Sequence, residues 1–252
     1  MSIGYGPRIV TDKLVFCVDV ADINSYPGIG TDLYDLSGNG YNGTMTDVTI
    51  TSDGHMSFNG QTPGSAVAFP ESNISKDPSL YLGDSSGRFT YECWVNKQGE
   101  NHNPATTARI MSTDVSDYNG IVWYGSSNSN HPNKLNFYYD GNVQTATELR
   151  SSSTLSTNTW YHIVCTCDAS LTAGNIKIYI NGEEDASKNF TNDSNFGSGT
   201  SRAFAIGSNT ENTVQYNNGL NGYIDICRIY GKPLSADEVK QNFNATRGRF
   251  GI

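Results

Sequence analysis

Oxygen-bearing side chains crowd into one short stretch, Tyr34–Thr44, which reads YDLSGNGYNGT. From Asp35 onward, an aspartate, a serine, an asparagine and a glycine take positions 1, 3, 5 and 6 of the spacing that opens an EF-hand calcium loop. That loop closes with a bidentate glutamate at position 12, where this chain has Thr46. Two interpretations stay open: a calcium site of another kind, or tight turns in which Asp35 accepts backbone hydrogen bonds.

Carboxylates that could cleave a glycosidic bond lack partners at the required spacing. A retaining glycosidase needs two carboxylates about 5 Å apart, and side chains two residues apart share one face of a strand. Asp225 stands alone in IDIC, Glu92 is alone in its segment, and Glu183–Asp185 reads as a charged turn. The four histidines lie far apart without metal-ligand spacing. The sequence therefore predicts a protein that is not an enzyme, with polysaccharide cleavage as the less favoured alternative.

Aromatic rings and polar side chains interleave through the middle of the chain, and this mixture suits sugar binding. A sugar ring presents C–H faces that stack on aromatic rings, while its hydroxyls need amide, carboxylate or backbone partners. Loop positions are the better candidates, because aromatic residues on strands commonly fill a core. The candidate ligand-binding residues are Tyr118, Trp123, Tyr124, Asn128, His131 and Tyr216.

The charge balance narrows the range of partners. Asp and Glu outnumber Lys and Arg by 25 to 16, giving a net charge of −9 at pH 7, and such a surface repels phosphate backbones. We therefore expect no nucleic-acid binding. No apolar stretch is long enough to span a membrane, and we see no signal peptide, so we expect no membrane insertion. The five cysteines occur in apolar segments without a C-x-x-C pair, which predicts reduced, buried thiols.

Many short strands must position these side chains. Apolar and polar residues alternate in Phe89–Asn96, and similar segments recur between loops rich in glycine, asparagine and serine. Asn181, followed by glycine, predicts a tight hairpin between two such segments. Ser235 and Glu238 are spaced as a capping box and predict one short helix near the end. The pattern predicts an all-β fold, a two-sheet antiparallel jelly-roll sandwich with one short C-terminal helix.

Several of these segments together resemble a known family. TWYHIVCTCD, IKIYING, AFAIGS and GYIDICRIYGKPLSADEVKQNF follow one another as the closing strands of laminin-G-like domains do. FTYECWV and DLSGNGYNGT are similar to earlier parts of such domains. The chain thus resembles laminin-G-like domains of the concanavalin A-like lectin/glucanase superfamily, of the kind found in tailed-bacteriophage virion proteins. The likeness runs over residues 13–246, and leaves an N-terminal arm, 1–12, and a C-terminal tail, 247–252.

The resemblance implies candidate metal ligands. Calcium sites recur in this superfamily, built from loop carboxylates and an aspartate on a terminal strand, and oxygen ligands suit calcium. The first and last strands commonly lie side by side in this fold. The resemblance therefore implies Asp19, Asp35, Asn39 and Asp225 as candidate ligands of a structural calcium ion, against the alternative that Asp35 only stabilises a turn.

The resemblance also implies a function. We expect a non-enzymatic surface or adhesion module, a phage virion structural protein made in the host cytoplasm and displayed on the virion surface. Its lectin-like domain would bind glycans on a cell surface. The alternative is a capsid or tail decoration protein without glycan binding, held by phage capsid or tail proteins through the arm and the RGRFGI tail. Assembly as a homo-oligomer is compatible with both.

Overall fold

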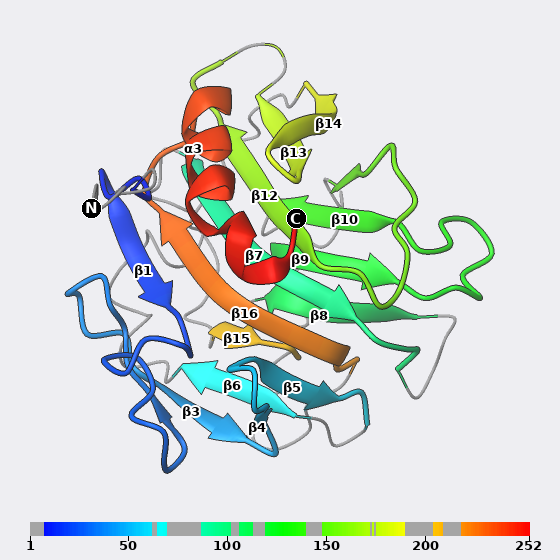
Figure 1. The fold of residues 1–252 in the computed structure, drawn as a ribbon. Coiled ribbons are helices and arrows are strands. Elements are labelled where there is room, and N and C mark those ends of the chain that lie inside the picture. Colours follow the sequence, from blue (N-terminus) through cyan, green and yellow to red (C-terminus); the bar gives the residue numbers. More distant parts are fainter. Residues whose placement is uncertain are drawn as a thin grey trace.

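A computed structural model describes residues 8–61, 65–69, 87–101, 106–112, 119–139, 148–171, 173, 175–189, 204–208 and 218–252. Within these ranges the chain forms two antiparallel sheets packed face to face, with a C-terminal helix on the outer side of one of them (Figure 1). This arrangement confirms the predicted all-β sandwich with one short C-terminal helix. No helix in the described ranges has the length and apolar character that crossing a bilayer requires.

Sheet A carries the helix. Its strand order is β14-β13-β12-β7-β16-β5-β4, and β1 pairs with the second half of β16, on the same side as β5. The first and last strands are therefore neighbours, as expected, with Val18 opposite Cys227. The strands are β1 (Leu14–Val18), β4 (Thr49–Ile50), β5 (Met56–Asn59), β7 (Arg88–Lys97), β12 (Tyr161–Asp168), β13 (Ile176–Ile180), β14 (Glu183–Lys188) and β16 (Asn221–Tyr230).

Sheet B forms the other layer, in the order β11-β10-β9-β8-β15-β6-β3-β2. Its strands are β2 (Asp32–Leu33), β3 (Gly43–Thr46), β6 (Ala66–Phe69), β8 (Thr107–Ser112), β9 (Asn119–Tyr124), β10 (Leu135–Tyr139), β11 (Glu148–Arg150) and β15 (Phe204–Ile206). The shortest strands, such as β2 and β4, were not predicted, because two residues cannot show a period of two.

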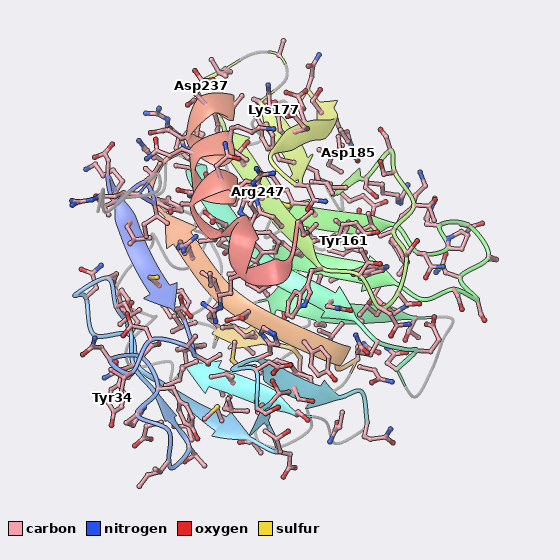
Figure 2. The ribbon with its side chains drawn as sticks, in the orientation of Figure 1. Tyr34, Tyr161, Lys177, Asp185, Asp237 and Arg247 are labelled. Carbon is pink, nitrogen blue, oxygen red and sulfur yellow. The ribbon has the colours of Figure 1, made fainter. Side chains whose placement is uncertain are left out.

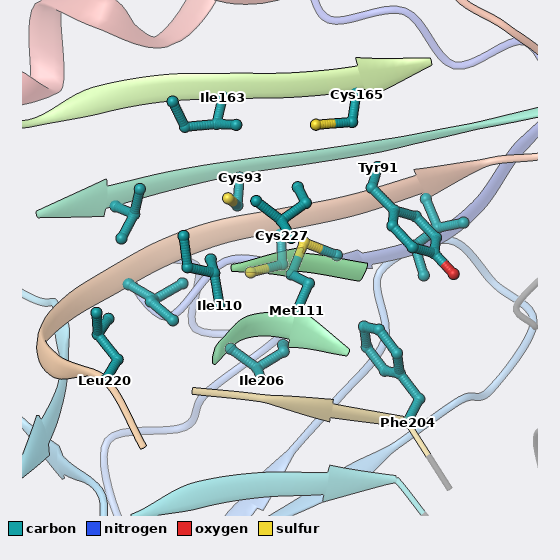
Figure 3. Packing of buried hydrophobic residues seen from close by; sticks show 14 of the residues in the cluster. Tyr91, Cys93, Ile110, Met111, Ile163, Cys165, Phe204, Ile206, Leu220 and Cys227 are labelled. Atoms are coloured by element: carbon teal, nitrogen blue, oxygen red, sulfur yellow. The ribbon is translucent and has the colours of Figure 1, made fainter. Parts of the chain in front are cut away.

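The core lies between the sheets and follows the predicted alternation. Phe89, Tyr91, Cys93 and Val95 of β7 all point into it. Figure 3 shows that cysteines of β7, β12 and β16 meet aliphatic and aromatic residues of sheet B. All five cysteines are buried and free, which confirms the prediction of reduced, buried thiols.

Helix α3 (Ala236–Thr246) covers the outer face of sheet A (Figure 1). The Ser235 hydroxyl accepts from the Glu238 amide, and the Glu238 carboxylate accepts from the Ser235 amide, so the predicted capping box is present. Val239 and Phe243 are buried against the sheet. The chain then continues as a 3-10 helix, η1 (Arg247–Phe250), which also packs on sheet A.

A buried ionic network joins α3 to sheet A. Glu92 accepts from Arg228 Nη1 at 2.5 Å, from His162 Nε2 at 3.1 Å and from Asn242 Nδ2 of α3 at 2.6 Å. Burial by itself would raise the pKa of Glu92, but Arg228, His162 and Asn242 outweigh it and lower that pKa to about 2. Asn242 also accepts from the Val10 amide, so the N-terminal segment joins the same network.

Candidate functional site

The outer face of sheet B carries a row of polar and aromatic side chains. Asn136 and Tyr138 alternate along β10 with Leu135 and Phe137, which point into the core. Gly120 of β9 lies opposite Tyr138. Gly120 has φ +137° and pairs with β8 just beyond a register shift in that strand. A Cβ on Gly120 would stand 2.0 Å from the Met111 carbonyl oxygen. Glycine is therefore required next to Tyr138.

These side chains form what we call the aromatic strip: Tyr124, His131, Asn136, Tyr138 and Glu148. The hydroxyls of Tyr124 and Tyr138 are 3.3 Å apart, and the rings of Tyr124 and His131 lie 5.5 Å apart between centroids. Asn136 Nδ2 donates to Glu148 Oε2 at 2.9 Å, while Asn136 Oδ1 is buried without a partner among the described residues. The strip thus combines ring faces with a buried amide group.

Protonation on the strip favours neutral rings. Burial, with the hydrogen bond to Tyr124, raises the pKa of Tyr138 to about 12. Burial and the charges of Arg150 and Lys134 lower the pKa of His131. At neutral pH we therefore expect a tyrosine hydroxyl and an uncharged imidazole, both able to donate and accept hydrogen bonds.

A cavity of about 510 Å³ lies beside the strip, where three loops meet at one end of the sandwich. The β9–β10 hairpin supplies lining residues to this loop cavity and His131 to the strip, so the two features share one element. The lining residues are Gly99, Glu100, Ser126, Asn133, Thr154, Leu155, Ser156 and Thr157.

Two oxygen acceptors stand out in the loop cavity. Lys97 Nζ lies 3.1 Å from each carboxylate oxygen of Glu100, and the Ser126 amide donates to the same carboxylate at 3.2 Å. The Lys97 side chain is only 1% exposed, so these contacts fix the orientation of Glu100. Asn133 Oδ1 is shielded from solvent and has no partner in the part of the chain that the structure describes. The loop cavity can accept hydrogen bonds from a hydroxyl-bearing ligand.

The predicted ligand-binding residues separate into three groups. The prediction of Trp123 as a ligand-binding residue is wrong, because its side chain points from β9 toward sheet A and is fully buried in the core. Tyr124 and His131 belong to the strip, and Asn128 Oδ1 accepts from the His131 amide at 2.8 Å, which shapes the hairpin turn. Tyr118 and Tyr216 lie outside the described residues.

Sequence reasoning missed Glu100 and Asn133. Lys97 lies only three residues before Glu100, but the second partner, Ser126, comes from another loop and is joined to Glu100 only by folding. Asn133 has φ +55°, a backbone conformation that asparagine tolerates better than most residues. The position of this asparagine, between a proline and a strand, was therefore the one local signal of a turn with positive φ.

The predicted calcium ligands from the glycine-rich stretch serve the backbone of β1. Asp35 Oδ1 accepts from the Cys17 amide at 2.9 Å and from the Ser37 amide at 2.9 Å. The Ser37 hydroxyl and Asn39 Nδ2 donate to the Val15 carbonyl at 2.8 and 2.7 Å. The turn interpretation of Asp35 therefore has direct geometric support.

The other two predicted ligands share one guanidinium. Arg249 of η1 contacts Asp19 Oδ1 and Asp225 Oδ1, each at 2.6 Å. His55 Nδ1 lies 2.6 Å from the second oxygen of Asp225. Burial raises the pKa of Asp225, while His55 and Arg249 oppose that rise. Across the described ranges no three His, Cys, Asp or Glu side chains form a group that could hold a metal ion. Carboxylate oxygens of Asp19, Asp35 and Asp225 are thus engaged by donors of the chain itself.

This fold and site define a lectin-type β-sandwich. A family model described as the concanavalin A-like lectin/glucanases superfamily matches residues 84–240. The chain belongs to that superfamily. A comparison with curated proteins finds no match.

Solved structures confirm the fold. The chain is similar to a Trypanosoma rangeli sialidase in complex with 2,3-difluorosialic acid, with a TM-score of 0.64 and 13% identity over 100% of this chain and 36% of the sialidase chain. It is also similar to the binding domain of botulinum neurotoxin DC in complex with rat synaptotagmin II, with a TM-score of 0.61 and 16% identity over 94% of this chain and 52% of that one. A third similar structure concerns botulinum neurotoxin type C, whose cell entry depends on interaction with two ganglioside molecules. Its TM-score is 0.60, with 17% identity over 93% of this chain and 52% of that one. The chain spans about a third to a half of these proteins.

Proposed function

We propose that the protein is a non-enzymatic adhesion module that binds glycans at the β9–β10 hairpin. The observation that carries the proposal is that one hairpin joins the aromatic strip to the loop cavity. A glycan on the strip would lie against the rings of Tyr124, His131 and Tyr138. Its hydroxyls would donate to the Glu100 carboxylate and to the Asn133 amide oxygen, both of which line the cavity.

A non-enzymatic role agrees with the state of the two strand carboxylates considered for catalysis. Glu92 is fully buried beneath α3 and held by three donors, so no substrate can reach it. Asp225 is also fully buried and is engaged by Arg249 and His55. The likeness to a sialidase concerns the fold and covers about a third of that enzyme.

We further propose display on a phage virion, where the module would contact capsid or tail proteins and a host-cell glycan. The support is the resemblance of the glycine-rich opening stretch to virion proteins of tailed phages. For one protein with a similar fold, botulinum neurotoxin type C, cell entry depends on interaction with two ganglioside molecules. A rigid sandwich with its polar hairpin at one end suits such display.

The second candidate, a decoration protein without glycan binding, rests on a different surface. The loop after β1 exposes Ile23 by 75% and Ile29 by 77%, and Tyr34 of the same loop is 40% exposed. Figure 2 shows Tyr34 at the outer edge of the molecule, away from Tyr161 and the centre of the sandwich. Apolar side chains gathered on one loop suit a protein contact. The RGRFGI tail suits such a contact less well, because Phe250 is buried against sheet A.

A glycan array with the purified chain tests the proposal, using three single variants. Asn133→Gly removes the amide while keeping a backbone that glycine adopts freely, and His131→Ala removes a ring from the strip. The matched control is Asp47→Gly, an exposed position that shares the positive φ of Asn133, at 52°. We expect each site variant to bind about tenfold more weakly and the control to bind normally.

The outcomes separate the two candidates. Binding that both site variants leave unchanged would place the glycan elsewhere and reject this hairpin as the site. An array without any bound glycan would favour the decoration protein. Electron microscopy of labelled virions tests the location, and absence of the chain from particles would remove the virion role.

A further inference from the structure

Asp19 and Asp225 face each other across a single positive charge that comes from the chain itself. Asp19 follows β1 and Asp225 lies on β16, so the two carboxylates come from neighbouring first and last strands. Two different nitrogens of the Arg249 guanidinium contact them, Nη1 at Asp19 and Nη2 at Asp225, each at 2.6 Å. We propose that Arg249 is a built-in cation that balances these two carboxylates, so that the fold needs no divalent metal ion between the strands.

The surroundings of Arg249 hold it in place. The next residue, Phe250, stacks on Trp94 with 4.0 Å between ring centroids and an angle of 14° between the planes. Trp160 and His55 flank the same ring at 4.8 and 6.1 Å. The packing of Phe250 among these rings thus fixes the position of the neighbouring Arg249. It also reduces the conformational entropy lost when the arginine side chain is ordered.

The charge is needed because Asp225 is fully buried. A buried carboxylate is costly unless hydrogen bonds and an opposite charge compensate it. Here Arg249 takes one oxygen and His55 takes the other, so both oxygens are occupied. A calcium ion needs six to eight oxygen ligands, whereas a planar guanidinium needs only two acceptors in its plane. The two aspartates match the second requirement.

This inference goes beyond the proposed adhesion function, since it concerns how the fold is closed. The C-terminal segment η1 ties the start of the chain to its last strand. It replaces a bound metal ion by a residue that cannot dissociate into the solvent. The fold is therefore expected to be independent of divalent cations.

Thermal unfolding of the full chain with calcium chloride or with a chelator tests the inference. We expect the melting temperature of the unmodified protein to be the same in both. Arg249→Ala should lower it by roughly 4–10 °C, because the buried Asp225 charge loses its partner. The matched control is Arg247→Ala, which removes an arginine of the same 3-10 helix that faces the Phe243 ring at 5.7 Å and no carboxylate.

Two further measurements identify the role of the charge. Adding Asp225→Asn to Arg249→Ala should recover much of the lost melting temperature, because the charge to be balanced is gone. Millimolar calcium should recover none of it in Arg249→Ala, because two aspartates supply too few oxygen ligands for a calcium ion.

A chelator that lowers the melting temperature of the unmodified protein would overturn the inference. Equal losses for Arg249→Ala and Arg247→Ala would also overturn it, as would recovery of the Arg249→Ala variant by calcium.

Discussion

At the scale of single residues, Glu92 is the charge on which the helix-covered face of sheet A depends. It is the only acceptor shared by a strand arginine, a strand histidine and a helix asparagine within the described residues. Replacing it by glutamine would leave Arg228 buried beside a neutral group, and Arg228 is only 3% exposed.

We therefore expect Glu92→Gln to lower the free energy of unfolding by roughly 3–5 kcal/mol. Urea denaturation measures this value. The matched control is Glu183→Gln, because the Glu183 side chain is 76% exposed and its one ion pair among the described residues is with Lys240 on the surface. The control should change stability by less than about 0.5 kcal/mol. Equal effects of the two variants would contradict the role of the network.

Acid should weaken the same network in a defined range. The folded-state pKa of Glu92 is lowered from its usual 4.5 to about 2, so the unfolded chain takes up the proton first. The stabilisation is complete above about pH 4.5 and is lost as the pH falls toward 2, by about 3 kcal/mol in total. Urea midpoints between pH 6 and 2.5 should fall less steeply for Glu92→Gln than for the unmodified chain.

At the scale of elements, the glycine-rich stretch completes β1. Strand β1 pairs with β16 along one side. Along its other side the Leu36 amide donates to the Cys17 carbonyl at 2.7 Å, and Asp35 accepts from the Cys17 amide. Ser37 and Asn39 satisfy the Val15 carbonyl. Side chains thus take the place of a further strand.

Asp35→Ala should therefore destabilise the fold by about 2–3 kcal/mol, because several donors that meet one carboxylate lose it together. The Asp35 carboxylate accepts from the amides of Cys17, Ser37 and Tyr41 and from the Ser37 hydroxyl. Chemical denaturation measures the loss. Asp32→Ala on the neighbouring β2 is the control, since Asp32 is exposed, and it should be nearly neutral. A loss that appears only when calcium is present would favour a metal role for Asp35 instead.

The sequence predicted elements well where the signal was local. The capping box at Ser235 and the hairpin at Asn181, with φ values of 52° and 81° at Asn181 and Gly182, depend on neighbouring residues alone. The partners of Glu92 and Asp225 were not predictable, because each lies on a different element. Glu92 was read as a lone strand carboxylate, and only the packing of α3 brings Asn242 to it.

At the scale of the whole molecule, a sealed core governs the chemistry of the cysteines. All five are buried, and burial raises the pKa of their thiols, to about 11 for Cys17. We expect none to react with a thiol reagent at pH 8 in the native state and all five to react in denaturant. The reaction is followed by absorbance, and one fast-reacting thiol in native buffer would contradict the burial seen here.

The β9–β10 hairpin, the proposed binding site, shows the limit of prediction at this scale. Alternation on β10 separates Leu135 and Phe137 from Asn136 and Tyr138, so one face of the strip was within reach of the sequence. Alternation on β9 likewise places Trp123 in the core, which contradicts its prediction as a ligand-binding residue. The loop cavity gathers three loops, and no local pattern reports that meeting.

The hydrogen bonds that side chains make to the outer edge of β1 have a consequence for molecules packed close together. Exposed strand edges let identical molecules add to one another in an open-ended series. On sheet A one such edge ends in the side chains of Asp35, Ser37 and Asn39, and the opposite edge strand, β14, reads Glu-Glu-Asp-Ala-Ser-Lys. Copies packed at high density, as on the shell of a particle, would meet charged or saturated margins at sheet A. The module is thus protected there against growing into fibres.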